Sequence, residues 1–212
     1  MKENASVLES LNALGAAARV RFIIDSGTLL GLHRDGRILH WDTDLDIAVL
    51  GVQDVEAVQR ALPRGTFSAW RFRRYVYKLR ISATVMGVSL PVDLKVFDLS
   101  GNEWISPSVG AGVGRSSPSS GWRGWFRPVW QWYVGLGDAA RFPLRHLVRV
   151  DHWAVPRPFF EKTRAWSEDL PFIQVPVEID AYLSFRYGDW HTPVKDWCYW
   201  RDDGAFVSAP PP

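Results

Sequence analysis

The chain has 212 residues, which is enough for one domain with a full hydrophobic core. With 47% hydrophobic and 23% charged residues, its composition is that of a globular protein and excludes a disordered one. A net charge of +2 argues against a nucleic-acid-binding protein, and the single cysteine, Cys198, excludes an internal disulfide and a cysteine-based zinc cluster.

Hydrophobic periodicity predicts alternating helices and strands over the first hundred residues. Residues 4–18 form a predicted helix whose apolar face carries Val7, Leu8, Leu11 and Leu14. Ser26 is the predicted N-cap of a short helix from about 28 to 33. The other elements expected in this half are strands at 21–25, 44–50, 66–82 (one or two strands) and 88–99, and a helix at 52–62.

The amino-acid composition of the chain changes at residue 100. Residues 100–121 are rich in Gly, Ser and Pro, which predicts a mobile loop, and a Trp-rich segment follows it. Two closing helices are expected over 156–194, the second opened by Pro176 and ended by Gly188. We therefore expect a single domain, 1–212, with a core at 20–100 and an insertion at 100–137.

Acidic residues stand directly before and within the apolar strand of "DTDLDIAVL". Because residues i and i+2 of a strand share a face, Asp44 and Asp46 should project together while Leu45 and Ile47 enter the core. Adjacent carboxylates repel each other, and a hard cation such as Mg²⁺ (or Mn²⁺) relieves that conflict and also binds substrate phosphate. The alternative interpretation of this pair is a solvated acidic loop.

A third acid, Asp93, stands between Val92 and Leu94 in another predicted strand. A lone acid with apolar neighbours on both sides indicates a purposeful, at least half-buried charge. If its strand lies beside that of Asp44 and Asp46, the three carboxylates converge on one metal. A salt bridge from Asp93 to Lys95 or Lys78 is the other interpretation.

The turn "DSGT" supplies a candidate anion site. Gly27 allows the backbone to approach a ligand, and the N–H groups of Gly27 and Thr28 should point outward from the start of a helix. Asp25 is expected to fix the backbone of the turn, and Asp42 to support the ligands without binding the metal itself.

These motifs together resemble the LicD/fukutin family. Residues 24–47, "IDSGTLLGLHRDGRILHWDTDLDI", follow its signature D-[GS]-G-T-L-L-G-x-x-R-x-x-x-x-I-P-W-D-x-D-I-D, with His40 in place of the proline. Residues 182–193, "YLSFRYGDWHTP", resemble its closing Y-L-x-x-x-Y-G-x-x-[WY]-x-x-P motif. The resemblance covers residues 20–100 and 176–194.

The resemblance implies an α+β fold with a nucleotidyltransferase-like mixed β-sheet, flanking helices and a C-terminal helical segment. It implies an enzyme that transfers a phospho-alcohol, such as phosphocholine or a polyol phosphate, from a CDP-linked donor to a hydroxyl of a glycan or polymer and releases CMP. Two alternatives stay open. One is a nucleotidyltransferase that moves NMP from an NTP to a small molecule, RNA or protein, and the other is a non-catalytic glycan-binding relative.

Roles for individual residues follow from the same resemblance. Asp44, Asp46 and Asp93 would be the catalytic, metal-binding acids, and Asp93 would also accept the proton of the acceptor hydroxyl. Arg34 matches the family's arginine and would clamp phosphate, for which a surface ion pair with Asp35 or Asp42 is the alternative. The full set of expected substrate-binding residues is Ser26, Gly27, Thr28, Arg34, Lys78, Arg80 and Lys95. For Lys78, Arg80 and Lys95, a position on a solvated strand face is an equally good interpretation.

The Trp-rich segment "GWRGWFRPVWQWY" has three interpretations: a platform for sugars, a peripheral membrane contact, and ordinary packing, which we favour. The first twenty residues contain no signal-peptide core, and no stretch of the sequence is long and apolar enough to span a membrane. We therefore expect a cytoplasmic protein, with peripheral contact at the inner face of the membrane as an option and no nucleic-acid partner.

Overall fold

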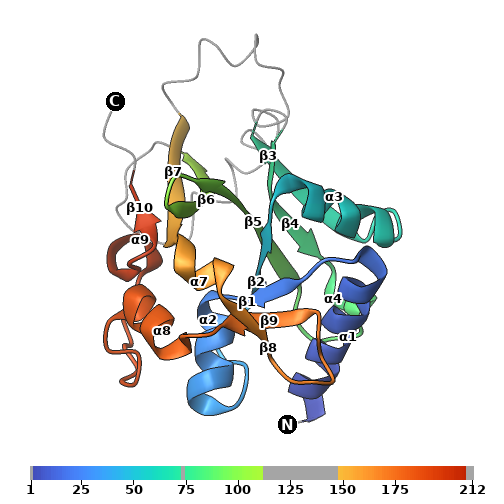
Figure 1. The fold of residues 1–212 in the computed structure, drawn as a ribbon, viewed down its shortest axis with the longest axis horizontal. Helices are drawn as coiled ribbons and strands as arrows, with labels where there is room; N and C mark the ends of the chain where they lie inside the picture. Colours follow the sequence, from blue (N-terminus) through green and yellow to red (C-terminus); the bar gives the residue numbers. More distant parts are fainter. Residues whose placement is uncertain (1, 73–74, 112–147, 209–212) are drawn as a thin grey trace, which may run out of the picture.

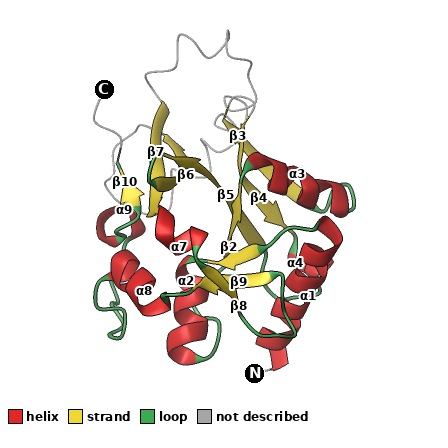
Figure 2. Ribbon diagram, in the orientation of Figure 1, coloured by secondary structure: helices red, strands yellow, loops and turns green. Residues whose placement is uncertain are grey.

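A computed structural model gives the fold and describes residues 2–72, 75–111 and 148–208. This part of the chain is a mixed β-sheet with helices beside it (Figures 1 and 2), which confirms the predicted α+β class. The helices are α1 (Lys2–Ala18), α2 (Ser26–Leu30), α3 (Val52–Ala61), α4 (Ala83–Met86), α7 (Arg157–Glu161), α8 (Ile179–Tyr187) and α9 (Tyr199–Asp202), and α2 continues into a π-helix, η1 (Gly31–Asp35). The strands are β1 (Phe22–Ile24), β2 (Leu45–Leu50), β3 (Phe67–Phe72), β4 (Tyr75–Ile81), β5 (Val92–Ser100), β6 (Glu103–Ala111), β7 (Val148–Pro156), β8 (Thr163–Ala165), β9 (Ile173–Pro176) and β10 (Phe206–Val207).

Strand β5 is the centre of the sheet. The strands run in the order β10-β7-β6-β5-β2-β1-β9-β8, and β4 with its partner β3 branches from β5. The first half of β5 pairs in parallel with β2 and antiparallel with β4, and its last residues pair with β6. This branching places β2, β5 and β4 side by side, so residues that are far apart in the sequence share one stretch of sheet.

The hydrophobic core includes residues of α1, α3 and α4, which lie together beside the sheet (Figure 1), and also residues of α2, α7 and α8. The predicted apolar face of α1 is confirmed, because Val7, Leu8, Leu11 and Leu14 are all buried. Leu45 and Ile47 of β2 also have no exposed surface, as the alternation predicts. The helices α2, α7, α8 and α9 lie at the other side of the molecule (Figure 2).

Two sequence predictions about helix ends are wrong. The N-cap of the short helix is Asp25, whose carboxylate accepts the N–H of Ser26, so the helix begins at Ser26 and not near residue 28. Pro176 does not open the second closing helix, α8 (Ile179–Tyr187). It ends β9 and pairs with Thr163, and α8 begins after Glu178, although it ends at Gly188 as predicted.

Two predictions about longer segments are also wrong. The expected loop from residue 100 contains β6, which pairs with β7 along its whole length. The remainder of the predicted insertion, 112–137, lies outside the described residues. The helix expected after residue 156 is only α7, because the chain turns at Lys162 into β8, which pairs with β9.

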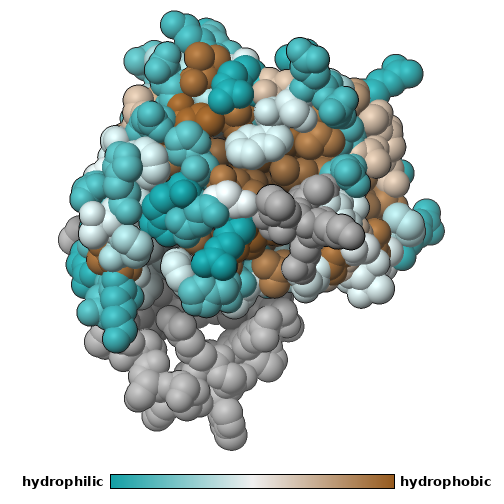
Figure 3. All heavy atoms as spheres, turned by 90° about the horizontal axis from the view of Figure 1, so that it is seen from below, coloured by the Kyte–Doolittle hydropathy of each residue, from teal (hydrophilic) through white to brown (hydrophobic). Residues whose placement is uncertain are grey.

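The face seen from below carries apolar residues toward its middle, with hydrophilic residues around them (Figure 3). Because apolar atoms make up more than half of the surface of an ordinary folded domain, this distribution alone assigns no function. No helix in the described residues has the length and apolar character needed to cross a membrane.

Gly204 tests the packing of the C-terminal segment against α8. A Cβ atom at this position would lie 2.0 Å from the carbonyl oxygen of Phe185, and the Gly204 N–H donates to the carbonyl of Arg186 at 2.9 Å. We expect Gly204→Ala to lower the free energy of unfolding by about 1–3 kcal/mol, as overpacking does, measured by urea denaturation. Gly65→Ala is the control, because a Cβ there meets nothing within 4 Å and the variant reports only the cost of a φ of +83°. Equal stability of the two variants would contradict the close packing.

Candidate active site

Three neighbouring strands present charged side chains to one face of the sheet. Asp46 on β2 lies opposite Asp93 on β5, and Asp93 lies opposite Arg80 on β4. Lys95, two residues after Asp93, lies opposite Lys78 on β4. Because cross-strand partners and residues i and i+2 share a face, all five side chains point to the same side of the sheet. The strand register thus builds a charged face that neither β2, β4 nor β5 contains alone.

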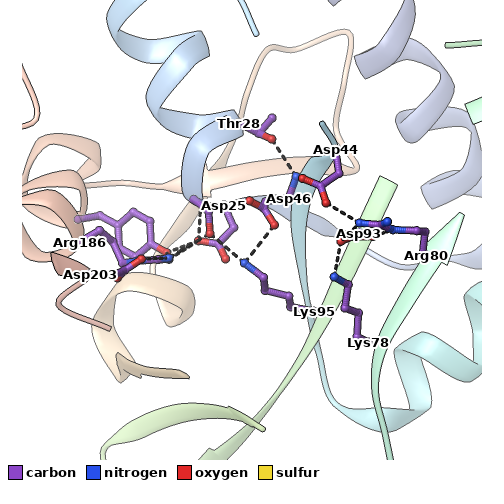
Figure 4. Close-up of polar contacts among 12 residues, drawn as sticks. Asp25, Thr28, Asp44, Asp46, Lys78, Arg80, Asp93, Lys95, Arg186 and Asp203 are labelled. Atoms are coloured by element: carbon purple, nitrogen blue, oxygen red, sulfur yellow. Dashed lines mark hydrogen bonds and ion pairs between the residues drawn. The ribbon is translucent and has the colours of Figure 1, made fainter. Parts of the chain in front are cut away.

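The charges on this face form ion pairs across the strands (Figure 4). Arg80 joins two acids, with Nε 2.5 Å from Asp93 Oδ1 and Nη2 2.5 Å from Asp44 Oδ2. Lys78 pairs with Asp93, and Lys95 Nζ lies 3.0 Å from Asp46 Oδ1. The salt bridge between Asp93 and Lys78 that the sequence left open is therefore present, while the partner of Lys95 is Asp46.

The carboxylates of this site have pKa values shifted in opposite directions, because neighbouring acids act on Asp42 and Asp44 while cations act on Asp93. Burial, a hydrogen bond with Asp93 and the charge of Asp46 raise the pKa of Asp44 to about 6. Burial and the charges of Asp46 and Asp44 likewise raise the pKa of Asp42 to about 6. Burial alone would raise the pKa of Asp93, but hydrogen bonding to Arg80 and the charge of Lys78 hold it below its usual value. Asp44 thus retains its proton more readily than Asp93.

The residues present fit a divalent cation of the kind that the family resemblance implies. Asp44 and Asp93 are close enough to share a hydrogen bond, and Asp46 lies opposite Asp93 in the strand register, so the site offers the oxygen ligands that a hard cation takes. Asp42 contributes a buried carboxylate oxygen, Oδ2, that has no hydrogen-bond partner. Among the described residues, no three acids lie close enough together to hold a metal ion. Lys78, Arg80 and Lys95 instead bind oxygens of these acids. A metal would therefore have to displace these cations from the acids.

The turn at the start of α2 lies beside the acids. The hydroxyl of Thr28 accepts the N–H of Asp46 at 2.8 Å, which ties α2 to β2. A Cβ at Gly27 would lie 3.2 Å from Asp42 Oδ2, so a larger residue there would require the Asp42 carboxylate to shift. The first N–H groups of a helix have no acceptor within the helix, so those of Gly27 and Thr28 keep their predicted role as phosphate donors. Thr28 itself is buried, and its side chain serves the structure.

A buried ionic network holds this turn from behind. Arg186 of α8, which is 1% exposed, lies 2.8 Å from Asp25 Oδ1 and 2.7 Å from both oxygens of Asp203. Tyr182 donates to the same oxygen of Asp25 and lies 2.8 Å from Arg186. Burial would raise the pKa of Asp25, but Arg186, Lys95 and the hydrogen bonds from Tyr182 and the Ser26 N–H hold it below its usual value. The prediction that Asp25 fixes the backbone of the turn is confirmed.

The acids and the turn face one cavity of about 1060 Å³. The predicted site residues that line it are Ser26, Gly27, Arg34, Asp44, Asp46, Lys78, Asp93 and Lys95; Thr28 and Arg80 do not line it. Aromatic side chains form much of the remaining lining: Trp41, Trp70, Tyr77, Trp153, Tyr187, Trp190, Trp197 and Tyr199. A cavity of this size with apolar walls and convergent charges is typical of a small-molecule site.

Arg34 is the predicted residue whose contacts differ most from its expected role. Its Nε and Nη2 atoms form a two-pronged pair with Asp35 at 2.8 and 3.0 Å, and Nη1 donates to the carbonyl of Trp190 at 3.3 Å. This is the ion pair that the sequence offered as the alternative. The phosphate contact of Arg34 stays a prediction, and it would require the pair to open.

The residues that sequence reasoning missed come from the C-terminal part of the chain. The sequence contains a feature that could have indicated Arg186, because it is a charged residue in a closing helix that is otherwise mostly apolar, "IDAYLSFRY". No sequence feature of this kind indicates Asp203 or Trp153. Trp153 places its ring 4.8 Å from Lys95 Nζ and 5.2 Å from the Arg186 guanidinium carbon, so it packs against both cations.

Paired acids on neighbouring strands and a glycine turn thus lie together at one cavity. Residues 19–93 match the LicD/FKTN/FKRP nucleotidyltransferase domain, which confirms the family resemblance for this segment. The match spans the turn, the D-x-D pair and Asp93, and it indicates a transferase. Comparison with curated proteins gives no match to the chain.

The shifted pKa values of Asp42 and Asp44 predict how stability depends on pH. Both groups bind protons more tightly when folded than an unfolded aspartate with a pKa of about 3.9, so their stabilising contribution is lost as the pH rises through about 6. In chelator-treated protein we expect the melting temperature to fall between about pH 4 and 7 and to fall less in Asp44→Asn. Asp25 and Asp93 have lowered pKa values, so their effect on stability changes at a lower pH than this range. An unchanged slope in Asp44→Asn, equal to that of the exposed control Asp169→Asn, would contradict the assignment.

Substitution of Arg34 separates its two roles. Lysine keeps the charge but not the paired contact with Asp35, which is an exposed interaction of small energy. If the ion pair is the role of Arg34, Arg34→Lys should retain turnover and donor KM within about threefold. A fall of ten times or more in turnover, which corresponds to about 1.4 kcal/mol, at an unchanged melting temperature would instead support the phosphate contact.

Proposed function

We propose that the protein transfers a phospho-alcohol from a CDP-linked donor to a hydroxyl of a glycan or polymer, with release of CMP. The observation that carries the proposal is the charged face of the sheet. It combines acids suited to a divalent cation with Lys78, Arg80 and Lys95, within or beside one cavity and in a LicD-type domain. Phosphoryl transfer depends on positioning and on neutralising charge, and these residues supply both.

Each group has a role in this proposal. Asp44 and Asp46, with Asp93, would hold Mg²⁺ or Mn²⁺, which when bound neutralises the diphosphate of the donor. Lys78 and Lys95 line the cavity and carry positive charge to the phosphate oxygens, while the turn offers its N–H groups. The proton-accepting role of Asp93 stays a prediction. Its low pKa and its ion pairs with Lys78 and Arg80 disfavour that role.

A donor screen with Mg²⁺ tests the proposal. CMP release would be measured from CDP-choline, CDP-ethanolamine, CDP-glycerol and CDP-ribitol, with a glycan acceptor. We expect release from at least one donor, and we expect Asp46→Asn to abolish it at an unchanged fold, because the variant keeps the shape of the side chain but loses its charge. Asp169→Asn, an exposed acid outside the cavity, should behave as wild type.

Other products would point to other functions. Release of pyrophosphate from an NTP, without CMP release from any CDP donor, would replace the proposal by a nucleotidyltransferase. Glycan binding without release of either product would indicate a non-catalytic relative. Full activity of Asp46→Asn would show that the acids are structural.

A further inference from the structure

Ser26 adopts a backbone conformation that serine rarely occupies. Its φ is +50°, and Arg19 is the one other non-glycine residue with positive φ in the described part of the chain. The side chain is 5% exposed and lines the cavity. The conformation is held by the network behind it, because Asp25 accepts the Ser26 N–H at 2.7 Å and is itself bound by Arg186. Strain of this kind persists where the surroundings fix it and is common at functional sites.

The hydroxyl oxygen of Ser26 accepts hydrogen bonds from two cationic groups. Arg186 Nη2 lies 3.0 Å and Lys95 Nζ 3.1 Å from Ser26 Oγ. Neither a guanidinium nor an ammonium group can accept a hydrogen bond, so the hydroxyl accepts from both and its own proton is left to donate. A hydroxyl that accepts from two cations is also a stronger donor, because hydrogen bonds in a chain polarise one another.

In the described part of the chain, no acid accepts a hydrogen bond from Ser26 Oγ, which itself accepts from Lys95 and Arg186. Asp25 uses Oδ1 for the Ser26 N–H, Tyr182 and Arg186, and its Oδ2 has no hydrogen-bond partner. Asp46 forms its ion pair with Lys95. The O–H of Ser26 is therefore available to a ligand in the cavity, and Lys95 and Arg186 beside it favour a negatively charged one.

We infer that the Ser26 hydroxyl donates a hydrogen bond to a phosphate oxygen of the diphosphate, and that Arg186 is a positioning residue that acts through Ser26. Arg186 reaches Ser26 from the closing helix while Asp203 and the ring of Trp153 hold its guanidinium in place. This inference rests on the proposed function for the identity of its ligand. Ser26 is already among the expected substrate-binding residues, and the inference adds the atom through which it binds, the proton on Oγ, and the buried cation that orients it.

The first experiment measures the affinity for inorganic pyrophosphate by calorimetry in the presence of Mg²⁺. Ser26→Ala removes only the hydroxyl, and Ser26→Gly removes it while allowing the positive φ without strain. We expect both variants to bind about ten times more weakly than wild type, as for a lost charge-assisted hydrogen bond. Ser184→Ala, on the exposed side of α8, is the matched control and should bind as wild type. Wild-type affinity in both Ser26 variants would overturn the role of the hydroxyl.

The second experiment is a double-mutant cycle of Arg186→Lys with Ser26→Ala, read as pyrophosphate affinity well below the melting temperature of each variant. If Arg186 acts through Ser26, Arg186→Lys should weaken binding in wild type but not further in Ser26→Ala. Additive losses would show that Arg186 is structural only. Tyr182→Phe replaces Arg186→Lys in the cycle if the latter does not fold, because it removes a hydroxyl bound to both Asp25 and Arg186.

These measurements are independent of turnover. If pyrophosphate affinities follow the cycle while no CDP donor releases CMP, the inference stands and the proposed function fails. If CMP is released and the Ser26 variants bind and turn over as wild type, the proposed function stands and the inference fails.

Discussion

The buried guanidinium of Arg186 is the interaction on which the geometry of the site depends. It joins the end of β1 to α8 and to the segment before β10, through Asp25 and Asp203. A charge without exposed surface is tolerated only with partners, and removal of one partner of such a pair costs about 3–5 kcal/mol. Because Asp25 is also the N-cap of α2, the same contact fixes the chain where the cavity needs its N–H groups.

Sequence reasoning selected charged residues that the structure brings near one another, but it did not rank them. The i, i+2 rule placed Asp44 and Asp46 on one face, and an isolated acid between apolar residues marked Asp93 correctly as buried. It could not rank Lys78 and Arg80 above an ordinary solvated strand face, because their role depends on the pairing of β4 with β5. Which strand lies beside which depends on packing between distant segments, and a local sequence pattern does not encode it.

The segments predicted wrongly are those whose partners are distant in sequence. Gly, Ser and Pro favour turns, so residues 103–111 look like a loop, yet β7 supplies hydrogen-bond partners along that whole segment. Thr163–Ala165 similarly forms a strand because β9 is available beside it. The N-cap of the short helix was predicted wrongly for a more local reason. Asp25 and Ser26 are both good N-caps in adjacent positions, and the choice between them fell to the contacts of Asp25 with Tyr182 and Arg186.

The two motifs of the family resemblance are separated by more than half of the chain, but they meet in space. Asp25 and Ser26 from the first motif contact Tyr182 and Arg186 from the second, at distances of hydrogen bonds. The segment that matches the LicD/FKTN/FKRP domain ends at Asp93, and it therefore contains the acids and the turn without the cations that hold the turn. An isolated 19–93 segment would leave the charge of Asp25 without Arg186 and one edge of β1 without its partner strand β9. The smallest unit that can hold the site is thus larger than the segment by which the family is recognised, because the closing helix supplies charge to the centre of the site.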